Sequence, residues 1–273
     1  MKFKILSLIA VLLLFSAFGK QSWSVSKQSD DAGRIDFRDD PTFVLGYLME
    51  VDESPLQDES SNNLDGILKG AGEPNFVTNA PSGYAPGSYD FDGTDDFINA
   101  GNSSTDLIWA DGEGMTLSIW AQHDDFGSGT NQDIYFRQGA NNAEGYSFEW
   151  NDIADPYDMG PVFNPLTGYS AVLDTTAAFR TSILGEWHHY VGTCDGQWMK
   201  TLYMDGEVVD VSIQQEVAYA IDTEIINIGG RADSAADAMN GRLKQPGMWR
   251  RKFVDQEVRS LYRYGMDGKA NHI

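Results

Sequence analysis

A period-two alternation near residue 190 is the clearest pattern in the chain, with Trp187, His189 and Val191 pointing to one side. This alternation, together with aromatic and β-branched content, predicts a strand. Asp195-Gly196 follows this run, and Asp205-Gly206 follows the next one. A two-residue Asp-Gly turn favours a tight hairpin, because both central residues need positive φ. The segment therefore predicts three antiparallel strands, with the Trp187 side in the core between two sheets and His189 as a hydrogen-bonded core histidine.

Similar short runs recur along the chain, separated by turn signals roughly every 8 to 12 residues. Residues 151–169 contain three prolines and predict a long loop, and Pro246 inside the last run predicts an edge strand or a bulge. One helix is expected near the C-terminus, capped by Asp255 and closed by Gly265. These features predict an all-β fold, an antiparallel two-sheet jelly-roll sandwich with one short C-terminal helix. The expected strands, including one hairpin, cover residues 43–52, 88–100, 115–122, 133–138, 145–150, 171–173, 179–184, 187–194, 199–204, 207–211, 224–229 and 239–249.

The N-terminus has the pattern of a secretory signal peptide. Two lysines precede an uncharged apolar run, Ile5–Phe18, and Gly19 supplies a small residue for cleavage. A membrane span needs roughly 20 apolar residues, and this run is shorter. We therefore expect export to the periplasm, the cell surface or the medium, with cleavage near Gly19. A flexible leader is expected over residues 20–40 and a single domain over residues 41–273.

The composition limits the possible partners. The formal net charge is −22 at pH 7, and such an acidic surface repels nucleic acid and anionic lipid. Cys194 is the only cysteine, so the chain forms no internal disulfide, and we expect a buried thiol. The remaining partner classes are a glycan and an extracellular protein surface.

Eight segments, in this order along the chain, resemble laminin-G-like domains of the concanavalin A-like lectin/glucanase superfamily. They are GYLMEVDES, QDESSNNLDGIL, YDFDGTDDFINAG, MTLSIWAQ, GEWHHYVGTCDG, KTLYMDGEVVD, INIGGRAD and MNGRLKQPGMWRRKFVDQEVRSLYRYG. The resemblance extends over residues 43–265. It implies two stacked antiparallel sheets with a concave face.

The resemblance also bears on metal binding. Members of the family often hold a structural Ca²⁺ with an acid near the C-terminus, and this chain has Lys244 at the matching position. An ammonium group cannot coordinate Ca²⁺, and our hypothesis is that it takes the place of the ion. Acidic residues elsewhere could still supply oxygen ligands to a Ca²⁺ ion. These candidate metal ligands are Asp58, Asp65, Asp92, Asp95 and Asp96.

No convincing catalytic constellation is present in the sequence. Glycosidases need two carboxylates on either side of the scissile bond, about 5 to 5.5 Å apart in retaining enzymes. The nearest pair, Glu149 and Asp152, would face opposite sides of a regular strand, so Glu149 is predicted to be a solvated strand residue. His188 and His189 are adjacent and cannot chelate one metal together. The sequence therefore argues against an enzyme.

Aromatic residues in predicted loops or near turns suit stacking on sugar rings, with neighbouring polar groups bonding the hydroxyls. Trp120, Trp187 and Trp249 are expected in the core instead. The first hypothesis is an exported, non-catalytic binding module for carbohydrate or an extracellular partner. The alternatives are a structural or adhesive envelope component and, ranked last, a glycan-cleaving hydrolase. The candidate ligand-binding residues are Tyr146, Trp150, Asp152, Tyr157 and Trp198.

Overall fold

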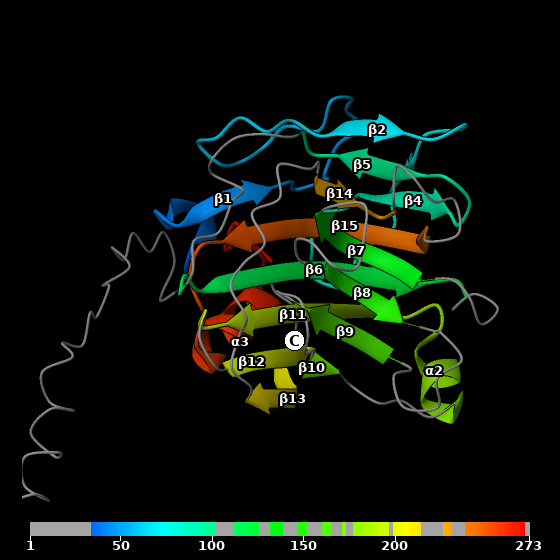
Figure 1. Cartoon of the computed structure of the whole chain (residues 1–273). Helices are drawn as coiled ribbons and strands as arrows, with labels where there is room; N and C mark the ends of the chain where they lie inside the picture. Colours follow the sequence, from blue (N-terminus) through cyan, green and yellow to red (C-terminus); the bar gives the residue numbers. More distant parts are fainter. Residues whose placement is uncertain are drawn as a thin grey trace, which may run out of the picture.

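The protein is an antiparallel two-sheet sandwich (Figure 1). Within its described residues the computed structural model contains fifteen strands, all paired antiparallel, and the two sheets stack face to face. The predicted all-β jelly-roll sandwich is therefore confirmed. The structure describes residues 34–101, 112–125, 132–138, 147–151, 160–164, 171–172, 177–196, 199–213, 226–230 and 238–270.

The larger sheet has eight strands in the order β13-β12-β11-β6-β15-β4-β3, with β1 also paired to β15. Its strands are β1 (Phe43–Gly46), β3 (Asn75–Val77), β4 (Ser88–Asp92), β6 (Met115–His123), β11 (Trp187–Cys194), β12 (Met199–Met204), β13 (Glu207–Ile213) and β15 (Asn240–Trp249). The smaller sheet has seven strands in the order β10-β9-β8-β7-β14-β5-β2. Its strands are β2 (Ile67–Lys69), β5 (Phe97–Asn99), β7 (Gln132–Gln138), β8 (Ser147–Asn151), β9 (Gly160–Asn164), β10 (Ala171–Val172) and β14 (Ile226–Ile228).

In the part of the chain that the structure describes, three helical segments accompany the sheets: η1 (Phe37–Asp39), α2 (Ala177–Ile183) and α3 (Asp255–Tyr264). The predicted C-terminal helix is α3, and Gly265 closes it with a φ of 71°. Asp255 is the first helical residue rather than the cap, which is Val254. Helix α2 covers a stretch that was expected to be a strand, so that prediction was wrong. None of the helices within the described ranges is long and apolar enough to cross a bilayer.

Large apolar side chains from both sheets form the core between them. Tyr190 and Leu243 come from the eight-stranded sheet, and Tyr135 and Phe148 come from the seven-stranded sheet. The rings of Tyr135 and Tyr190 stack with their centroids 5.3 Å apart. Cys194 is buried in the same core, as its sequence context predicts.

A second apolar cluster lies on the outer face of the eight-stranded sheet, beneath α3. Val191 packs in this cluster with Val258 of the helix. His189 is buried and shares a 2.8 Å hydrogen bond with Ser118, so its predicted role as a bonded core histidine is confirmed. The prediction that the Trp187 side of β11 fills the inter-sheet core was wrong. Because α3 and the C-terminal segment cover that side, both faces of β11 are apolar, and alternation alone does not distinguish them.

Strand β15 lies in the middle of its sheet and changes partner halfway along. Its first half pairs with β4, and its last residues pair with β1. The register against β6 shifts between Lys244 and Gly247, around Pro246. The predicted bulge is therefore confirmed, whereas the alternative of an edge position was wrong.

The predicted loop over residues 151–169 is interrupted by β9, which pairs with β8. A proline at position 161 is compatible with this strand, because only residues 162 and 163 of β9 pair with β10, so that position 161 has β8 alone as its paired neighbour. The seven-stranded sheet is consequently wider than the sequence indicates.

Candidate functional site

Trp150, one of the predicted sugar-stacking residues, lies in the core. It has no exposed surface, and its ring centroid is 5.3 Å from that of His123 and 6.2 Å from that of Tyr190. A ring without an exposed face cannot stack on a ligand that approaches from solvent. The structure therefore argues against the predicted role of Trp150 in ligand binding.

Glu149 precedes Trp150 on β8 and is only 7% exposed. The prediction that it is a solvated strand residue was therefore wrong. The other four predicted ligand-binding residues lie outside the described residues, so their roles stay predictions. They are Tyr146, Asp152, Tyr157 and Trp198.

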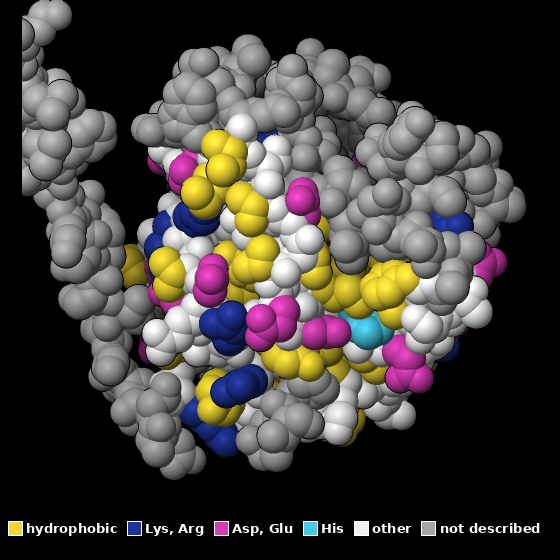
Figure 2. All heavy atoms as spheres, turned by 90° about the horizontal axis from the view of Figure 1, so that it is seen from below, with side chains coloured by type: hydrophobic (Ala, Val, Ile, Leu, Met, Phe, Trp, Pro, Cys, Tyr) yellow, Lys and Arg dark blue, Asp and Glu magenta, His cyan; other side chains and the backbone are white. Residues whose placement is uncertain are grey.

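A groove of about 580 Å³ lies on the outer face of the eight-stranded sheet, between β12, β13 and the start of α3. Figure 2 views the molecule from the side on which these elements lie and shows hydrophobic side chains beside acidic and basic ones. The groove is lined by Met199, Thr201, Tyr203, Val208, Val211, Lys252, Phe253, Val254, Asp255, Gln256 and Arg259.

A bulge in β13 shapes this groove. The register between β12 and β13 shifts at Leu202 and Tyr203, so that Val209 is an extra residue in β13. Val208 and Val211 are three positions apart and would face opposite sides of a regular strand, but the bulge restores them to one side. Both are exposed, at 41% and 44%, and both line the groove.

The groove combines an apolar floor with a charged rim. Tyr203 donates a 2.9 Å hydrogen bond from its hydroxyl to Asp255. Burial, followed by this carboxylate, raises the pKa of Tyr203 to about 12, so the phenol stays protonated and keeps donating. Arg259 pairs with Glu207 at 3.3 Å at the exposed edge. Such a surface can hold a ligand that has both apolar and hydrogen-bonding faces.

Asp58, a predicted metal ligand, is instead the centre of a hydrogen-bonded loop. Its two carboxylate oxygens accept from the backbone N–H groups of Gly46, Ser60 and Leu64 and from the Ser60 hydroxyl, at 2.6 to 3.0 Å. Two carboxylate oxygens offer about four acceptor sites, and these donors use them all. The structure therefore argues against Asp58 as a metal ligand.

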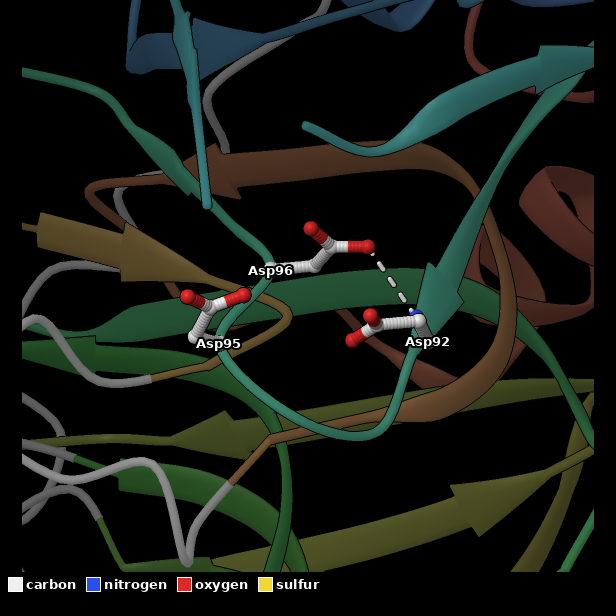
Figure 3. A group of neighbouring side chains, drawn as sticks. All are labelled: Asp92, Asp95 and Asp96. Carbon is white, nitrogen blue, oxygen red and sulfur yellow. Dashed lines mark hydrogen bonds between the residues drawn. The ribbon is translucent and has the colours of Figure 1, made fainter. Parts of the chain in front are cut away.

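Asp92, Asp95 and Asp96, three further predicted metal ligands, are brought together. One carboxylate oxygen from each lies within 4.8 Å of the others, at the turn between β4 and β5 (Figure 3). Asp92 is exposed, Asp95 is partly buried, and Asp96 is 1% exposed. Burial raises the pKa of Asp96 to about 6; the negative charges of its acidic neighbours add to this, and a hydrogen bond from the Asp92 N–H opposes it.

Lys244 lies where the resemblance implies a Ca²⁺-binding acid. Its side chain is fully buried, and its ammonium group donates to the backbone carbonyls of Leu48 at 3.3 Å and Gly87 at 2.8 Å. These carbonyls follow β1 and precede β4, where β15 changes partner. Burial lowers the pKa of Lys244 to about 8, although the charges of Glu50 and Asp267 oppose the shift. A cation of the protein itself holds this position, so these residues do not fit a Ca²⁺ ion.

The sequence interpretation missed the groove. Its apolar residues come from two strands and one helix, and a bulge that the alternation does not reveal brings Val208 and Val211 to one side. The available signal was the three valines within residues 208–211, in a strand with no predicted neighbour beyond it. Because β13 ends the sheet, Val208 and Val211 are left uncovered.

Comparison of the sequence with known families gives a match to the concanavalin A-like lectin/glucanases superfamily over residues 92–259. This match covers more than half of the chain. No curated protein matches the sequence.

Solved structures share the fold at low sequence identity. Domain 4 of AbnA, an extracellular arabinanase from Geobacillus stearothermophilus solved in complex with arabinotriose, aligns with a TM-score of 0.61 and 11% identity, covering 81% of this chain and 98% of that domain. The binding domain of Paraclostridial Mosquitocidal Protein 1 aligns with a TM-score of 0.59 and 16% identity. The alignment covers 83% of this chain and 52% of that domain. The receptor binding domain of botulinum neurotoxin D aligns with a TM-score of 0.57 and 14% identity. The alignment covers 81% of this chain and 52% of that domain. The chain thus spans about half of each toxin domain.

Proposed function

Because this chain belongs to the concanavalin A-like lectin/glucanase superfamily, we propose that it is an exported, non-catalytic module that binds carbohydrate. The observation that carries the proposal is the alignment with almost the whole of an arabinanase domain that was solved with arabinotriose. The toxin domains with the same fold are also binding or receptor-binding domains. A fold hosts many functions, so this proposal needs a site and a direct test.

The groove beside β13 supports the proposal as a place for the sugar. Val208, Val211 and Val254 offer exposed apolar surface to the C–H face of a sugar ring. Gln256 and Arg259 are exposed on the first turns of α3 and line the rim, where they can bond hydroxyl groups. Trp198, a predicted stacking residue, immediately precedes Met199 of the groove in the chain.

The absence of catalysis is part of the proposal. Glu149, the candidate acid, is almost fully buried on β8, next to the core residue Trp150. A glycosidase presents both of its carboxylates to the substrate. Reducing ends released from polysaccharide by the wild type, and lost in Glu149→Gln, would overturn this part of the proposal.

Export is proposed from the N-terminal pattern alone. Expression of the full chain, followed by N-terminal sequencing of protein recovered outside the cytoplasm, tests it. The expected new N-terminus lies near Lys20. An intact N-terminus on exported protein would contradict cleavage near Gly19.

The binding proposal is tested on the mature chain with a glycan array that includes arabino-oligosaccharides, followed by calorimetric titration of each hit. Arg259→Ala is expected to weaken binding by roughly tenfold, because a charge-assisted hydrogen bond is worth about 1.5 to 3 kcal/mol. Arg263→Ala is the matched control, since Arg263 lies one turn further along α3 and does not line the groove. Binding that is unchanged in Arg259→Ala would place the sugar elsewhere, and no binding at millimolar sugar would overturn the proposal.

A structural or adhesive role is the second candidate. The observation that favours it is the exposed apolar edge of the sheet, where Val208, Val211 and Ile213 are 41%, 44% and 66% exposed. Exposed edge strands pair readily with another chain. This role predicts concentration-dependent self-association that Val211→Lys reduces, together with an absence of glycan binding.

A further inference from the structure

The turn between β4 and β5 joins the two sheets, since β4 belongs to the larger sheet and β5 to the smaller one. Asp92 ends β4, and Asp95 and Asp96 directly precede β5. Gly93, the first residue after β4, has a φ of 73°, a conformation that glycine adopts without strain and that lets the chain turn here. Three carboxylates therefore converge at the point where the chain crosses from one sheet to the other (Figure 3).

Asp96 provides an observation that does not depend on the clustering of acids. Its side chain is 1% exposed, and one oxygen, Oδ2, accepts a 3.0 Å hydrogen bond from the Asp92 N–H. The other oxygen, Oδ1, is buried without a hydrogen-bond partner among the described residues. Buried polar atoms are satisfied in most cases, and an ion is one reason for an exception. In Figure 3 the Asp96 carboxylate lies above those of Asp92 and Asp95, and the oxygen that is not bonded to the Asp92 N–H is the one on the side of Asp95.

Arg242 of β15, which is paired with β4, forms ion pairs with other acids. Arg242 pairs with Asp90 at 3.1 Å and with Asp124 at 3.0 Å. Within the described part of the chain, no lysine or arginine forms a salt bridge with the carboxylates at positions 92, 95 and 96. Among the described residues, several like charges thus converge without a cation paired to them, in contrast to ordinary buried carboxylates.

We propose that Asp92, Asp95 and Asp96 bind a hard divalent cation of the Ca²⁺ class. Carboxylate oxygens are the ligands that Ca²⁺ prefers, at about 2.3 to 2.6 Å, so two oxygens on opposite sides of one ion lie roughly 5 Å apart. The 4.8 Å limit on the distances between the three ligand atoms falls within this span. Backbone carbonyls and water complete the six to eight ligands that Ca²⁺ takes.

The cation would also link the turn to a third segment. The N–H of Ala71 donates to both oxygens of Asp95 at 3.1 Å, and residues 70–71 directly follow β2. Gly70 has a φ of 135°, and a side chain there would collide with Asp96. The backbone of this segment therefore packs closely against the site, and cation binding is expected to stabilise the joint between the sheets.

Titration of the full mature chain with Ca²⁺ alone, followed by calorimetry and by thermal unfolding after EDTA treatment, tests this proposal. We expect one site with a Kd of about 10⁻⁴ to 10⁻³ M, the range of extracellular Ca²⁺ modules, and a higher Tm with Ca²⁺. Glycan is absent from this experiment, so its outcome is independent of the proposed carbohydrate binding.

Two substitutions locate the site. Asp96→Asn keeps the shape and one acceptor but removes a charge, and it is expected to weaken Ca²⁺ binding at least tenfold. Asp95→Asn changes a partly exposed member of the cluster and gives the same test if Asp96→Asn does not fold. Asp52→Asn, an identical change on an exposed loop, is the matched control and is expected to bind like the wild type.

Three results would overturn the proposal. The first is an absence of binding and of any Tm shift at millimolar Ca²⁺. The second is binding that Asp96→Asn and Asp95→Asn leave unchanged. The third is Mg²⁺ binding as tight as Ca²⁺ binding, which would contradict the assignment to a large, flexibly coordinated ion.

Discussion

The loop around Asp58 and the turn around Asp96 each bury a carboxylate, and their surroundings differ. Asp58 accepts four hydrogen bonds, three of them from backbone N–H groups. Asp96 accepts one, from Asp92, and leaves an oxygen without a hydrogen-bond partner among the described residues. Both segments are acidic and polar in sequence, and both are candidate metal sites on that basis.

The difference shows what separates a structural carboxylate from a candidate ligand site. Donors from three parts of the loop region stabilise the charge of Asp58, so its oxygens have no remaining capacity for an ion. Asp96 has the charges of Asp92 and Asp95 beside it, and these disfavour its ionised form. An acidic segment therefore indicates a metal site only when its carboxylates keep acceptor sites that no donor uses.

The largest expected effect comes from Asp58→Ala. Loss of the carboxylate leaves the N–H groups of Gly46, Ser60 and Leu64 without this acceptor, whereas the Ser60 hydroxyl can still donate to the Val44 carbonyl, and the free energy of unfolding should fall by about 3 to 5 kcal/mol. Urea denaturation with and without Ca²⁺ measures the change. Asp52→Ala, on an exposed loop, should stay within about 0.5 kcal/mol of the wild type. A loss that appears only in the presence of Ca²⁺ would make Asp58 a metal ligand and remove the contrast with Asp96.

Lys244 extends the comparison to a buried positive charge that has acceptors. Its folded-state pKa of about 8 lies below the roughly 10.4 of an unfolded chain. Between these two values the unfolded chain holds more protons, so stability rises with pH. The gain is about 3 kcal/mol, of which little is present below pH 8 and all is present above pH 10.5. A neutral amine still has two hydrogens for the carbonyls of Leu48 and Gly87.

Urea denaturation from pH 7 to 10.5 measures this gain as the difference between the wild type and Lys244→Met. Subtracting the free energy of unfolding of the variant from that of the wild type cancels the contributions of other titrating groups. Tyr84 is one of these groups, because burial raises its pKa. A difference that falls with increasing pH would mean that the ammonium form is the one that the two carbonyls stabilise more strongly.

Asp96→Asn should have a smaller effect, and its sign should depend on the ion. In EDTA the variant removes a charge that lies among acids, so it is expected to raise the free energy of unfolding by about 1 kcal/mol. In saturating Ca²⁺ the wild type should be the more stable of the two, because only its site binds the ion tightly. Two urea series at constant pH check this reversal. A destabilised variant in EDTA would show that the second carboxylate oxygen has a structural partner.

The fold could be predicted largely because its local signals are strong. Asp205 and Gly206 have φ values of 53° and 79°, as the tight hairpin requires. Pro246 marks a bulge. The inward face of β11 could not be predicted, because burial of Val191 under α3 depends on a segment more than sixty residues away in sequence. Periodicity reports that a face is covered, and it does not identify the element that covers it.

The candidate sites were predictable only in part. The sequence brings Asp92, Asp95 and Asp96 together, because they flank one short turn. It does not reveal that the backbone N–H of Gly46 reaches Asp58 across twelve positions. Hydrogen bonds between distant backbone groups and side chains depend on the packed tertiary structure. The sequence therefore identifies acidic residues as candidate metal ligands, and it does not distinguish a structural carboxylate such as Asp58 from a candidate ligand such as Asp96.

The smallest expected effect on stability comes from Asp95→Asn, and it makes the comparison sharpest. Asp95 is partly exposed, and the amide oxygen that replaces its carboxylate can still accept from the Ala71 N–H. In EDTA the free energy of unfolding should therefore stay within about 0.5 kcal/mol of the wild type. Binding of Ca²⁺ should nevertheless weaken by roughly tenfold, since the ion loses a charged ligand. Calorimetry and urea denaturation of the same preparation measure the two quantities, and a stability loss that matches the affinity loss would mean that Asp95 acts on the turn rather than on the ion.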